Sequence, residues 1–474
     1  MAKGVIKWFI GWPDLVKYLG LISVTLGVTY YAPASIRFIW YVIMLVSYSF
    51  SKNEPLWLAL FLSTSDGFIG FFGLYEATIP LLPGLPAVEV AQFYILLTVV
   101  KAAGRNLKPV LFYHRYFQIL IIYLIFSVIW GQMMGLSGGL NVYFRVIKGI
   151  IPLLLFYSVP RLFTDRGMYE RFFRIVFVIV LLAFAAQLLT LFTGMTPMEA
   201  GGLIPDEENE RDEFRVFYNA SSTLLGLFGA LFVLTGKISR PLSRLIPFAV
   251  LIAALAMALL SATRGWIISF SLVIILSVLL TGMIRSRRNI SIVIISIPVI
   301  IWALANPTIS MQVDYARERL ETMEAISEGD LTARGTLQRL DFRSQRVMGG
   351  WRENPLFGWG LSDKGYDYLD DHVGNQSILA LYGVIGFVLL NGFLIYFAYM
   401  MMGLYFRFPP GHPYRDELIV FVIFLVGWFF IHSTSGQQFS FSGMPEKIIP
   451  QALFFSFGAL QFNKSIITLN GKKV

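Results

Sequence analysis

Long apolar segments recur along the whole chain and limit what it can fold into. Each is about 17 to 25 residues long, and a helix of about 20 residues crosses roughly 30 Å of hydrocarbon. A helix also satisfies its backbone hydrogen bonds internally, so the chain is predicted to be an all-α polytopic membrane protein. About twelve to fourteen spans can be drawn. The fullest set covers approximately residues 15–31, 34–50, 55–75, 87–103, 110–134, 142–160, 173–193, 217–236, 245–262, 265–284, 290–306, 373–403, 417–435 and 447–462.

Composition supports the same class, because 56% of the 474 residues are hydrophobic and only 14% are charged. One soluble core does not have such a composition. We expect three parts: residues 1–306 with about eleven spans, a large extracytoplasmic loop at 307–371 that contains short helices, and residues 372–474 with about three spans. The absence of cysteine excludes disulfides and thiolate metal sites.

Two of the predicted spans are irregular. The third is interrupted by Asp66 and Gly67, and the fourth follows the proline-rich stretch Pro80–Pro86. Glycine and proline interrupt regular helices, so either span is a candidate for a broken or re-entrant helix. The N-terminal residues 1–12 lack the pattern of a removable signal peptide, and we expect the first span to direct membrane insertion.

Lysine and arginine gather in alternate short loops, which predicts the orientation of the chain in the membrane. The basic loops contain Lys101, Arg105 and Lys108; Arg161, Arg166 and Arg171; Lys237, Arg240 and Arg244; Arg285, Arg287 and Arg288; and Arg407 and Arg415. The alternate loops, near Pro33, Pro80 and Gly138, contain neither residue. The basic loops and both termini are therefore predicted to be cytoplasmic. This accounts for the net charge of +9, so nucleic-acid binding is not expected.

An arginine-rich helix is predicted within the loop at 307–371. Thr336 is a suitable capping residue for its first turn. Arg339, Arg343 and Arg346 follow at i, i+4 and i+7, which places them on one helix face. Guanidinium groups bind phosphate through paired hydrogen bonds, so this face is a candidate anion site. The alternative is a helix that lies on anionic lipid headgroups.

The rest of the loop is predicted from its helix and turn residues. A helical pattern runs from Asp314 to Ser327. Pro355 ends the arginine-rich helix, and Gly358 and Gly360 permit a tight turn after it. A shorter acidic loop at about 194–216 is interpreted as a solvated surface.

Charged residues at the predicted span ends are the other candidates for function. Arg264 lies in a very short hairpin between two apolar spans, and a cation in this position is a candidate functional residue. The alternative is that its side chain extends to lipid phosphates. His372 lies where the long loop re-enters the membrane, and an imidazole there can accept a proton. His432 lies near the same end of its span and can line the same cavity. Metal-binding histidine pairs and a nucleotide-type glycine loop are lacking, so no cofactor is expected.

Several of these motifs resemble the O-antigen ligase and polymerase superfamily. The resemblance rests on Gln338-Arg339-Leu340, the turn from Glu353 to Gly360, His372, and the glycine pair in Gly383-Val384-Ile385-Gly386. Arg264 after a threonine and the stretch Arg215-Val216-Phe217-Tyr218-Asn219 are similar to further motifs of the family. Val373 stands where the family has asparagine after the histidine, and Asn375 follows two places later. The loop arginine of the family corresponds to Arg339, Arg343 or Arg334.

The resemblance implies a metal-independent, inverting membrane glycosyltransferase. It would polymerise undecaprenyl-diphosphate-linked oligosaccharide repeat units of O-antigen, capsule or exopolysaccharide on the outer leaflet of the bacterial inner membrane. His372 would be the catalytic base. Arginine can stabilise a leaving diphosphate, and the implied diphosphate ligands are Arg264, Arg339, Arg215 and Arg343. Residues expected to line the cavity are His432, Asn375, Gly358 and Gly360.

Two alternatives remain open. A ligase would transfer the glycan to lipid A core or another acceptor with the same parts. A lipid-linked oligosaccharide flippase would need charges inside the spans. Those present include Arg145, Lys148 and Lys447, and many such charges lie near helix ends. Expected partners are the lipid-linked oligosaccharide, the bilayer and a chain-length regulator.

Overall fold

The structure is a computed structural model of the whole chain. It describes residues 13–71, 77–80, 87–105, 107–136, 140–202, 216–236, 245–281, 283, 304–327, 336–370 and 372–471, with the side chains of 140–142, 322–327 and 336–341 excepted. Arg215 and most of the span predicted at 290–306 therefore lie outside the described residues.

The described elements are helical apart from one short hairpin. In chain order they are α2 (Pro13–Tyr31), α3 (Ala34–Phe50), α4 (Glu54–Ser65), β1 (Thr78–Ile79), β2 (Val88–Glu89), α5 (Val90–Ala103), α6 (His114–Met133), α7 (Leu140–Ile150), the 3-10 helix η2 (Ile151–Leu154), α8 (Leu155–Leu162), α9 (Arg166–Thr193), α10 (Pro197–Ala200), α11 (Ala220–Thr235), α12 (Leu245–Leu260), α13 (Arg264–Leu280), α15 (Pro307–Ser327), α16 (Thr336–Glu353), α17 (Asp363–Tyr368), α18 (Gly374–Tyr405), α19 (Pro413–Thr434) and α20 (Pro445–Leu469). The two strands pair antiparallel.

Six spans among the described residues are long and apolar enough to cross a membrane. They are α6, the continuous stretch 143–162, α9, α18, α19 and α20. Shorter apolar helices are α3, α5, α11, α12 and α13. The prediction of an all-α membrane protein is confirmed at this level, while the count of twelve to fourteen spans stays a prediction.

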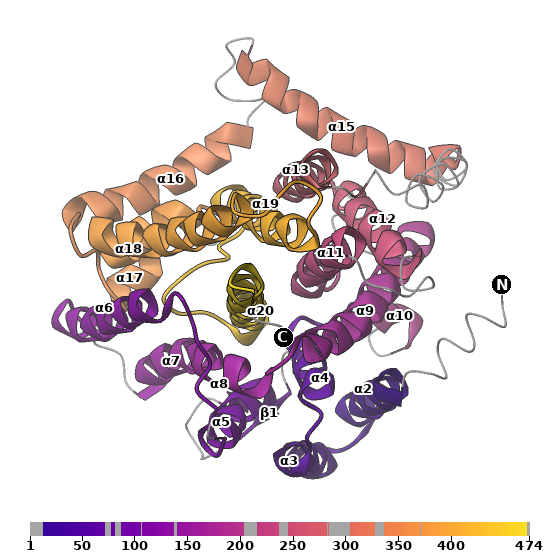
Figure 1. Ribbon diagram of the computed structural model, residues 1–474, viewed down its shortest axis with the longest axis horizontal. Helices are drawn as coiled ribbons and strands as arrows, with labels where there is room; N and C mark the ends of the chain where they lie inside the picture. Colours follow the sequence, from indigo (N-terminus) through magenta and orange to yellow (C-terminus); the bar gives the residue numbers. More distant parts are fainter. Residues whose placement is uncertain are drawn as a thin grey trace.

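The core of the molecule is built around α20. Figure 1 shows this helix near the centre, and α4, α8, α11, α18 and α19 pack against it. Its apolar side chains are buried on several sides, which a helix surrounded by other helices requires. Aromatic rings fill the contacts, for example Tyr169 and Phe457 stacked at 4.5 Å between centroids. Such packing of large rings holds helices together where lipid offers no hydrophobic driving force.

Helices α15 and α16 lie at the edge of the molecule in Figure 1. Helices occur at both positions predicted within residues 307–371, and α15 begins at Pro307 rather than at Asp314. On α15, Gln312 Nε2 donates to the Leu260 carbonyl at 2.6 Å, which joins this helix to the end of α12. Helix α16 packs along α18.

Contacts between antiparallel neighbours define two ends of the bundle. At one end α18 begins and α19 ends, and Asn375 Nδ2 donates to Ser433 Oγ at 2.7 Å. At the other end α18 finishes and α19 begins, and Arg415 donates to the Tyr405 hydroxyl at 3.2 Å. We call the first end the loop end, because α16 and α17 pack against α18 there. We call the second end the basic end.

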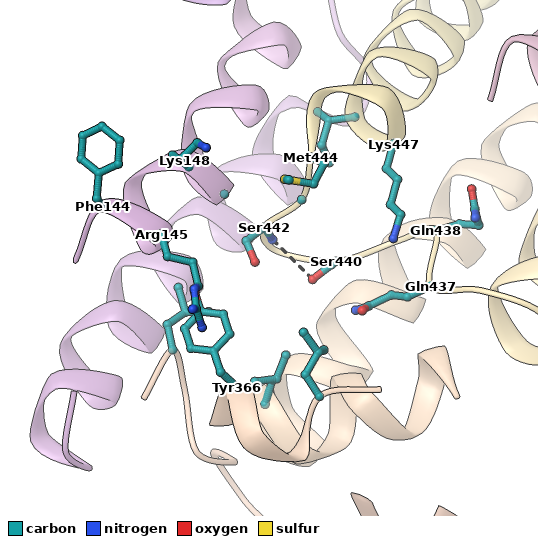
Figure 2. Close-up of a pocket in the computed structure, with 16 residues that line it drawn as sticks. Phe144, Arg145, Lys148, Tyr366, Gln437, Gln438, Ser440, Ser442, Met444 and Lys447 are labelled. Carbon is teal, nitrogen blue, oxygen red and sulfur yellow. Dashed lines mark hydrogen bonds between the residues drawn. The ribbon is translucent and has the colours of Figure 1, made fainter. Parts of the chain in front are cut away.

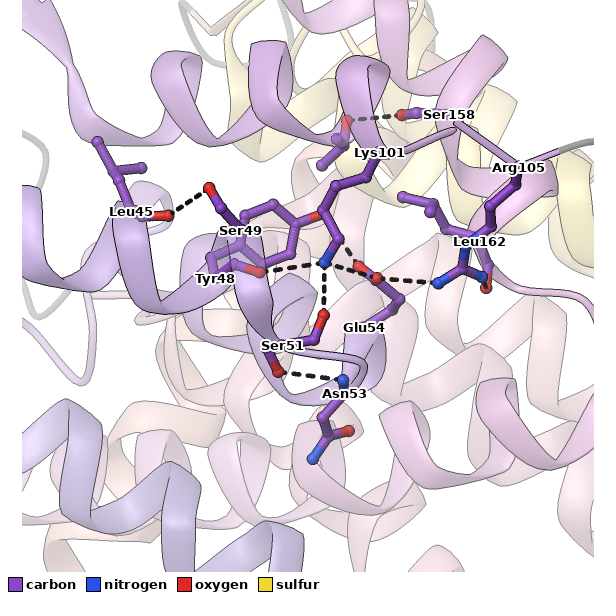
Figure 3. Close-up of polar contacts among 11 residues, drawn as sticks. Leu45, Tyr48, Ser49, Ser51, Asn53, Glu54, Lys101, Arg105, Ser158 and Leu162 are labelled. Carbon is purple, nitrogen blue, oxygen red and sulfur yellow. Dashed lines mark hydrogen bonds and ion pairs between the residues drawn. The ribbon is translucent and has the colours of Figure 1, made fainter. Parts of the chain in front are cut away.

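Ion pairs gather at the basic end. Glu54, which begins α4 and is buried, accepts both Lys101 and Arg105, at 2.8 and 3.3 Å (Figure 3). Lys101 also donates to the carbonyls of the α3 C-terminus, so it ties α3, α4 and α5 together. Further ion pairs link Arg171 to Asp14 and Arg166 to Glu417. Basic residues of loops far apart in sequence are thus brought to one end, as the predicted cytoplasmic location of these loops requires.

The interruption predicted at Asp66 and Gly67 is confirmed. Helix α4 is 12 residues long, is buried throughout and ends directly before Asp66. The Asp66 carboxylate accepts the main-chain N–H of Ser222 at 2.8 Å, at the start of α11. In return, Asn219 Oδ1 accepts the N–H of Ile69 at 2.7 Å. These reciprocal bonds satisfy the free helix end and fix the broken segment to α11.

Candidate functional site

A break in α18 organises the loop end. Gly383 has φ 61° inside the helix, so the carbonyls and N–H groups on either side of it lose their helical partners. The turn after α16, at residues 354–360, supplies new hydrogen-bond partners for these groups. Trp359 N–H donates to the Ala380 carbonyl at 2.9 Å, and Gly360 N–H donates to the Leu381 carbonyl at 2.7 Å. Beyond the break, the N–H groups of Val384 and Ile385 donate to Pro355 and Leu356.

Gly358 and Gly360 are needed for this backbone pairing. They have φ of 65° and 60°, a region that glycine enters without strain. A Cβ at Gly358 would lie 2.5 Å from the Leu381 carbonyl carbon, and one at Gly360 would lie 2.7 Å from the Ser127 carbonyl oxygen. Trp130 Nε1 also donates to the Gly358 carbonyl at 2.9 Å. The two glycines pack against α18 and α6. This packing role differs from the cavity-lining role predicted for them.

Helix α16 is held beside the start of α18 by a small apolar cluster. Val347, Val373 and Ala380 form its buried part. Trp359 Nε1 donates to the Gly350 carbonyl at 2.8 Å, which attaches the turn to α16 as well. The arginine face of α16 is thereby placed next to the loop that leads into α18.

Arginine and histidine meet at this point in what we call the rim cluster, a shallow depression lined by Phe342, Arg343, Arg346, Leu369, Asp370 and His372. The Asp370 carboxylate lies 3.3 Å from Arg346 and 3.8 Å from Arg343. It also accepts the main-chain N–H of His372 at 2.9 Å. Asp370 is mostly buried, whereas the side chains of Arg343 and Arg346 are 41% and 45% exposed.

The rim cluster brings together two predicted site residues, Arg343 and His372. His372 is exposed, so its imidazole is open to a substrate. Arg339 lies one helical turn before Arg343 on the backbone of α16, and its side chain is outside the described residues. Arg215 is outside them altogether.

Arg264 and Asn375 lie close to the end of α19. Arg264 begins α13, and the next residue, Gly265, packs directly against Ser435 and Thr434. Asn375 donates to Ser433 at 2.7 Å, while its buried Oδ1 has no hydrogen-bond partner within the described part of the chain. Both predicted residues are thus at the loop end, on either side of α19.

His432 holds a loop rather than facing a substrate. It is buried, and its Nδ1 accepts the main-chain N–H groups of Gln438 and Phe439 at 3.0 and 3.2 Å. A nitrogen that accepts in this way carries no proton. The cavity-lining role predicted for His432 is therefore indirect, because this residue fixes the segment after α19, whose side chains line the cavity described next.

A cavity of about 550 Å³ lies beside the rim cluster. Figure 2 shows the residues that line it. We call it the cationic cavity; Leu369 lines both. Its basic residues are Arg145 and Lys148 of α7 and Lys447 of α20. The remaining lining residues are Phe144, Gly149, Leu361, Tyr366, Leu369, Leu381, Gln437, Gln438, Ser440, Ser442, Gly443, Met444 and Ile448.

The charges of the cavity are partly balanced by neighbouring groups. Glu89 lies 3.5 Å from Lys148, and the Arg145 guanidinium lies 5.2 Å from the centre of the Tyr366 ring. Burial raises the pKa of the Tyr366 phenol, and the nearby Tyr382 raises it further, although Arg145 opposes this. The Tyr366 hydroxyl therefore stays protonated at neutral pH and can donate a hydrogen bond.

Sequence reasoning did not assign this cavity. Arg145, Lys148 and Lys447 are charges within predicted spans, and a charge at such a position is a functional signal on its own. Their meeting depends on α7 and α20 packing at the same end, which no local pattern indicates.

No group of three or more histidine, aspartate or glutamate side chains that could hold a metal ion occurs within the part of the chain that the structure describes. The site offers guanidinium, ammonium, hydroxyl and amide donors, which suit an anion. Comparison of the chain with protein-family models and with curated proteins finds no match. The resemblance to the O-antigen ligase and polymerase superfamily stays a prediction.

Proposed function

We propose that the protein is a membrane glycosyltransferase that polymerises undecaprenyl-diphosphate-linked oligosaccharide repeat units on the outer leaflet. The observation that carries this proposal is the rim cluster, in which Arg343 and Arg346 of α16 meet Asp370 and the exposed His372. Guanidinium groups beside a proton acceptor suit transfer of a sugar from a diphosphate.

The residues of the loop end have separate parts in this reaction. His372 takes the proton of the acceptor hydroxyl while the oxygen of that hydroxyl bonds to the anomeric carbon. The bond from that carbon to the diphosphate breaks, and the diphosphate leaves with the electron pair. Arg343 and Arg264 stabilise its charge without a metal ion. Attack opposite the leaving group inverts the anomeric carbon.

Asp370 positions the other groups of the rim cluster. Its carboxylate pairs with both arginines and accepts the His372 main-chain N–H. These contacts limit the freedom of two long side chains before substrate binds, which lowers the entropic cost of binding.

The arrangement of basic residues supports the proposed orientation. Lys101, Arg105 and Arg166 form ion pairs at the end of the bundle opposite the rim cluster. Under the positive-inside rule the basic end is cytoplasmic, and the rim cluster faces outward in the bacterial inner membrane. Both termini are then inside.

A lipid-linked oligosaccharide flippase is the second candidate. The cationic cavity favours it, because Arg145, Lys148 and Lys447 supply the charges that a transport path for an anionic lipid needs. A ligase shares every group of the rim cluster with a polymerase and differs only in its acceptor.

Purified protein incubated with the carrier-linked repeat unit in EDTA tests these functions. A ladder of products supports the polymerase. Addition of glycan to a lipid A core acceptor alone would replace it by a ligase. Absence of turnover with either acceptor, together with movement of the lipid across vesicle membranes, would overturn the proposed enzymatic function and favour the flippase.

Substitution of the proposed base gives a sharper test. His372→Gln is expected to lower turnover by at least about 100-fold, the usual contribution of a general base. His114→Gln is the matched control, because His114 is also exposed and begins α6 at the basic end. Normal turnover in His372→Gln, measured at equal protein amounts, would remove the proposed base.

A further inference from the structure

The cationic cavity is not used by the transfer chemistry at the rim cluster. It is lined by α7, α17, α18, the segment after α19 and the start of α20. Figure 2 shows Arg145, Lys447 and Gln437 reaching toward the same space from three of these segments. Its volume of about 550 Å³ lies in the range of small-molecule sites, roughly 300–1,000 Å³.

The charge of the lining selects an anion. Arg145, Lys148 and Lys447 all contribute, and Glu89 offsets Lys148 from 3.5 Å away. Arg145 forms no ion pair among the described residues, so its positive charge remains in a partly desolvated space. A bound group of opposite charge would interact strongly there.

Gln437 indicates that this space suits a polar ligand. The residue is only 6% exposed, and its Nε2 is buried without a hydrogen-bond partner among the residues that the structure describes. Buried amide donors are nearly always satisfied in folded proteins. Because Gln437 lines the cavity, an oxygen atom of a bound molecule is the partner that its position calls for.

The other polar groups of the cavity suit hydroxyl-rich ligands. Ser440 and Ser442 can donate and accept, and the Ser442 hydroxyl is already oriented by the Tyr382 hydroxyl at 3.1 Å. Leu361 and Leu381 add apolar surface beside them. Mixed apolar, amide and hydroxyl surfaces match the alternating faces of a sugar ring better than they match a bare phosphate.

We propose that the cationic cavity binds a negatively charged sugar unit of the uronic acid class, presented by the glycan that the rim cluster transfers. This inference rests on the proposed function, because it takes the ligand to be the glycan of that reaction. Leu369 separates the two sites, so a sugar held in the cavity lies beside the point of transfer. The cavity would then select repeat units that carry an acidic sugar.

Direct binding measurements test this proposal without any transfer reaction. The protein is placed in nanodiscs of phosphatidylcholine and titrated by calorimetry with disaccharides that contain glucuronate or galacturonate. The same disaccharides with the carboxyl group reduced to an alcohol are the neutral probes. We expect the acidic disaccharides to bind at least about tenfold more tightly, as a charge-assisted hydrogen bond provides.

Two variants locate the binding site. Arg145→Gln is expected to weaken uronate binding about tenfold and to leave the neutral probes unchanged. Its control is Arg352→Gln, which removes the same charge from an exposed position on α16. Equal loss of uronate affinity in both variants would mean that net charge alone attracts the probe. It would overturn the assignment of the binding site to the cationic cavity.

Gln437→Leu separates a ligand contact from a structural one. The unpartnered donor makes no protein hydrogen bond to lose, so thermal stability should be unchanged or higher. Affinity for the uronate probe should fall about fivefold, the effect of one neutral hydrogen bond. The control Gln376→Leu removes a half-buried amide that does not line the cavity and whose buried Oε1 also lacks a hydrogen-bond partner among the described residues. Reduced stability with unchanged affinity would overturn the role given to Gln437.

Other occupants are distinguished by further probes. Tight binding of inorganic diphosphate that is lost in Arg145→Gln, with no uronate binding, would assign the cavity to the carrier diphosphate instead. Binding of phosphatidylglycerol that is lost in Arg145→Gln, with no uronate binding in phosphatidylcholine nanodiscs, would assign it to a lipid headgroup. Uronate binding by a protein that fails the transferase assay would uphold the cavity and refute the proposed reaction.

Discussion

Single glycines decide how the loop end is built. Gly358, Gly360 and Gly383 all adopt positive φ, and each allows one backbone to touch another without an intervening side chain. Their spacing in the sequence indicates a turn and a glycine pair, and it is also the pattern on which the family resemblance rests. The physical reason for that pattern is the pairing of a turn with a broken helix, which satisfies backbone groups that α18 leaves free.

Gly358→Ala should destabilise the protein by about 2 kcal/mol, since alanine at positive φ is strained and its Cβ would meet the α18 backbone at 2.5 Å. Gly349→Ala is the control, because Gly349 lies within α16 with open space around it. That change should be neutral or stabilise by up to about 1 kcal/mol. Thermal unfolding in detergent measures both, and equal unfolding temperatures would contradict the backbone contact.

At the scale of elements, short helices are held by charges at their ends. Helix α4 has 12 residues and α5 has 14, too few to span a bilayer unaided. At the basic end Glu54 joins the start of α4 to Lys101 and Arg105 at the end of α5. At its other end, α4 is attached to α11 through Asp66. Irregular backbone at membrane depth is tolerated where protein surrounds it, as these contacts provide.

Glu54→Gln should lower stability by about 3 kcal/mol, because it removes one partner of a buried pair and leaves Lys101 with an uncompensated charge. The Lys101 side chain is 15% exposed and that of Glu54 is 1% exposed. Arg171→Gln is the control: Arg171 is 41% exposed and pairs with Asp14 at 2.7 Å. An exposed pair contributes about 1 kcal/mol or less. Unfolding in increasing concentrations of denaturing detergent measures the stability of both variants. A similar loss of stability in the two variants would show that Glu54 is not screened from water.

The whole molecule is a bundle with two chemically different ends. Ion pairs of basic loops gather at one end, and the rim cluster and the cationic cavity lie at the other. A membrane normal along the bundle would put these ends on opposite sides of the bilayer. The proposed function requires the rim cluster to face outward, since the substrate lipid is taken from the outer leaflet.

Single-cysteine variants test this orientation directly, because the natural chain contains no cysteine. Lys52 and Arg352 are both exposed, at the basic and loop ends respectively. Arg352→Cys should react with a membrane-impermeant maleimide in spheroplasts, while Lys52→Cys should react only after the membrane is opened. The reverse pattern would invert the topology and contradict an outward-facing site. Labelling of both after detergent treatment confirms that each cysteine is accessible.

The class of the protein and the approximate positions of many of its helices could be predicted from local sequence. Apolar length and helical periodicity are properties of local segments, so spans and the break at Asp66 can be predicted from neighbouring residues. The rim cluster was partly predictable for the same reason: Arg343 and Arg346 share a helix face, and His372 follows in the same loop.

Tertiary structure alone decided which distant segments meet. Arg145 and Lys447 line one cavity because α7 and α20 are brought together at the same end, and Asp370 holds the rim cluster through a contact that no motif predicts. Gly358 and His432 turned out to fix backbone rather than to line a cavity. Lipid-facing and helix-facing residues are equally apolar, so hydropathy places a helix in the membrane without specifying its neighbours.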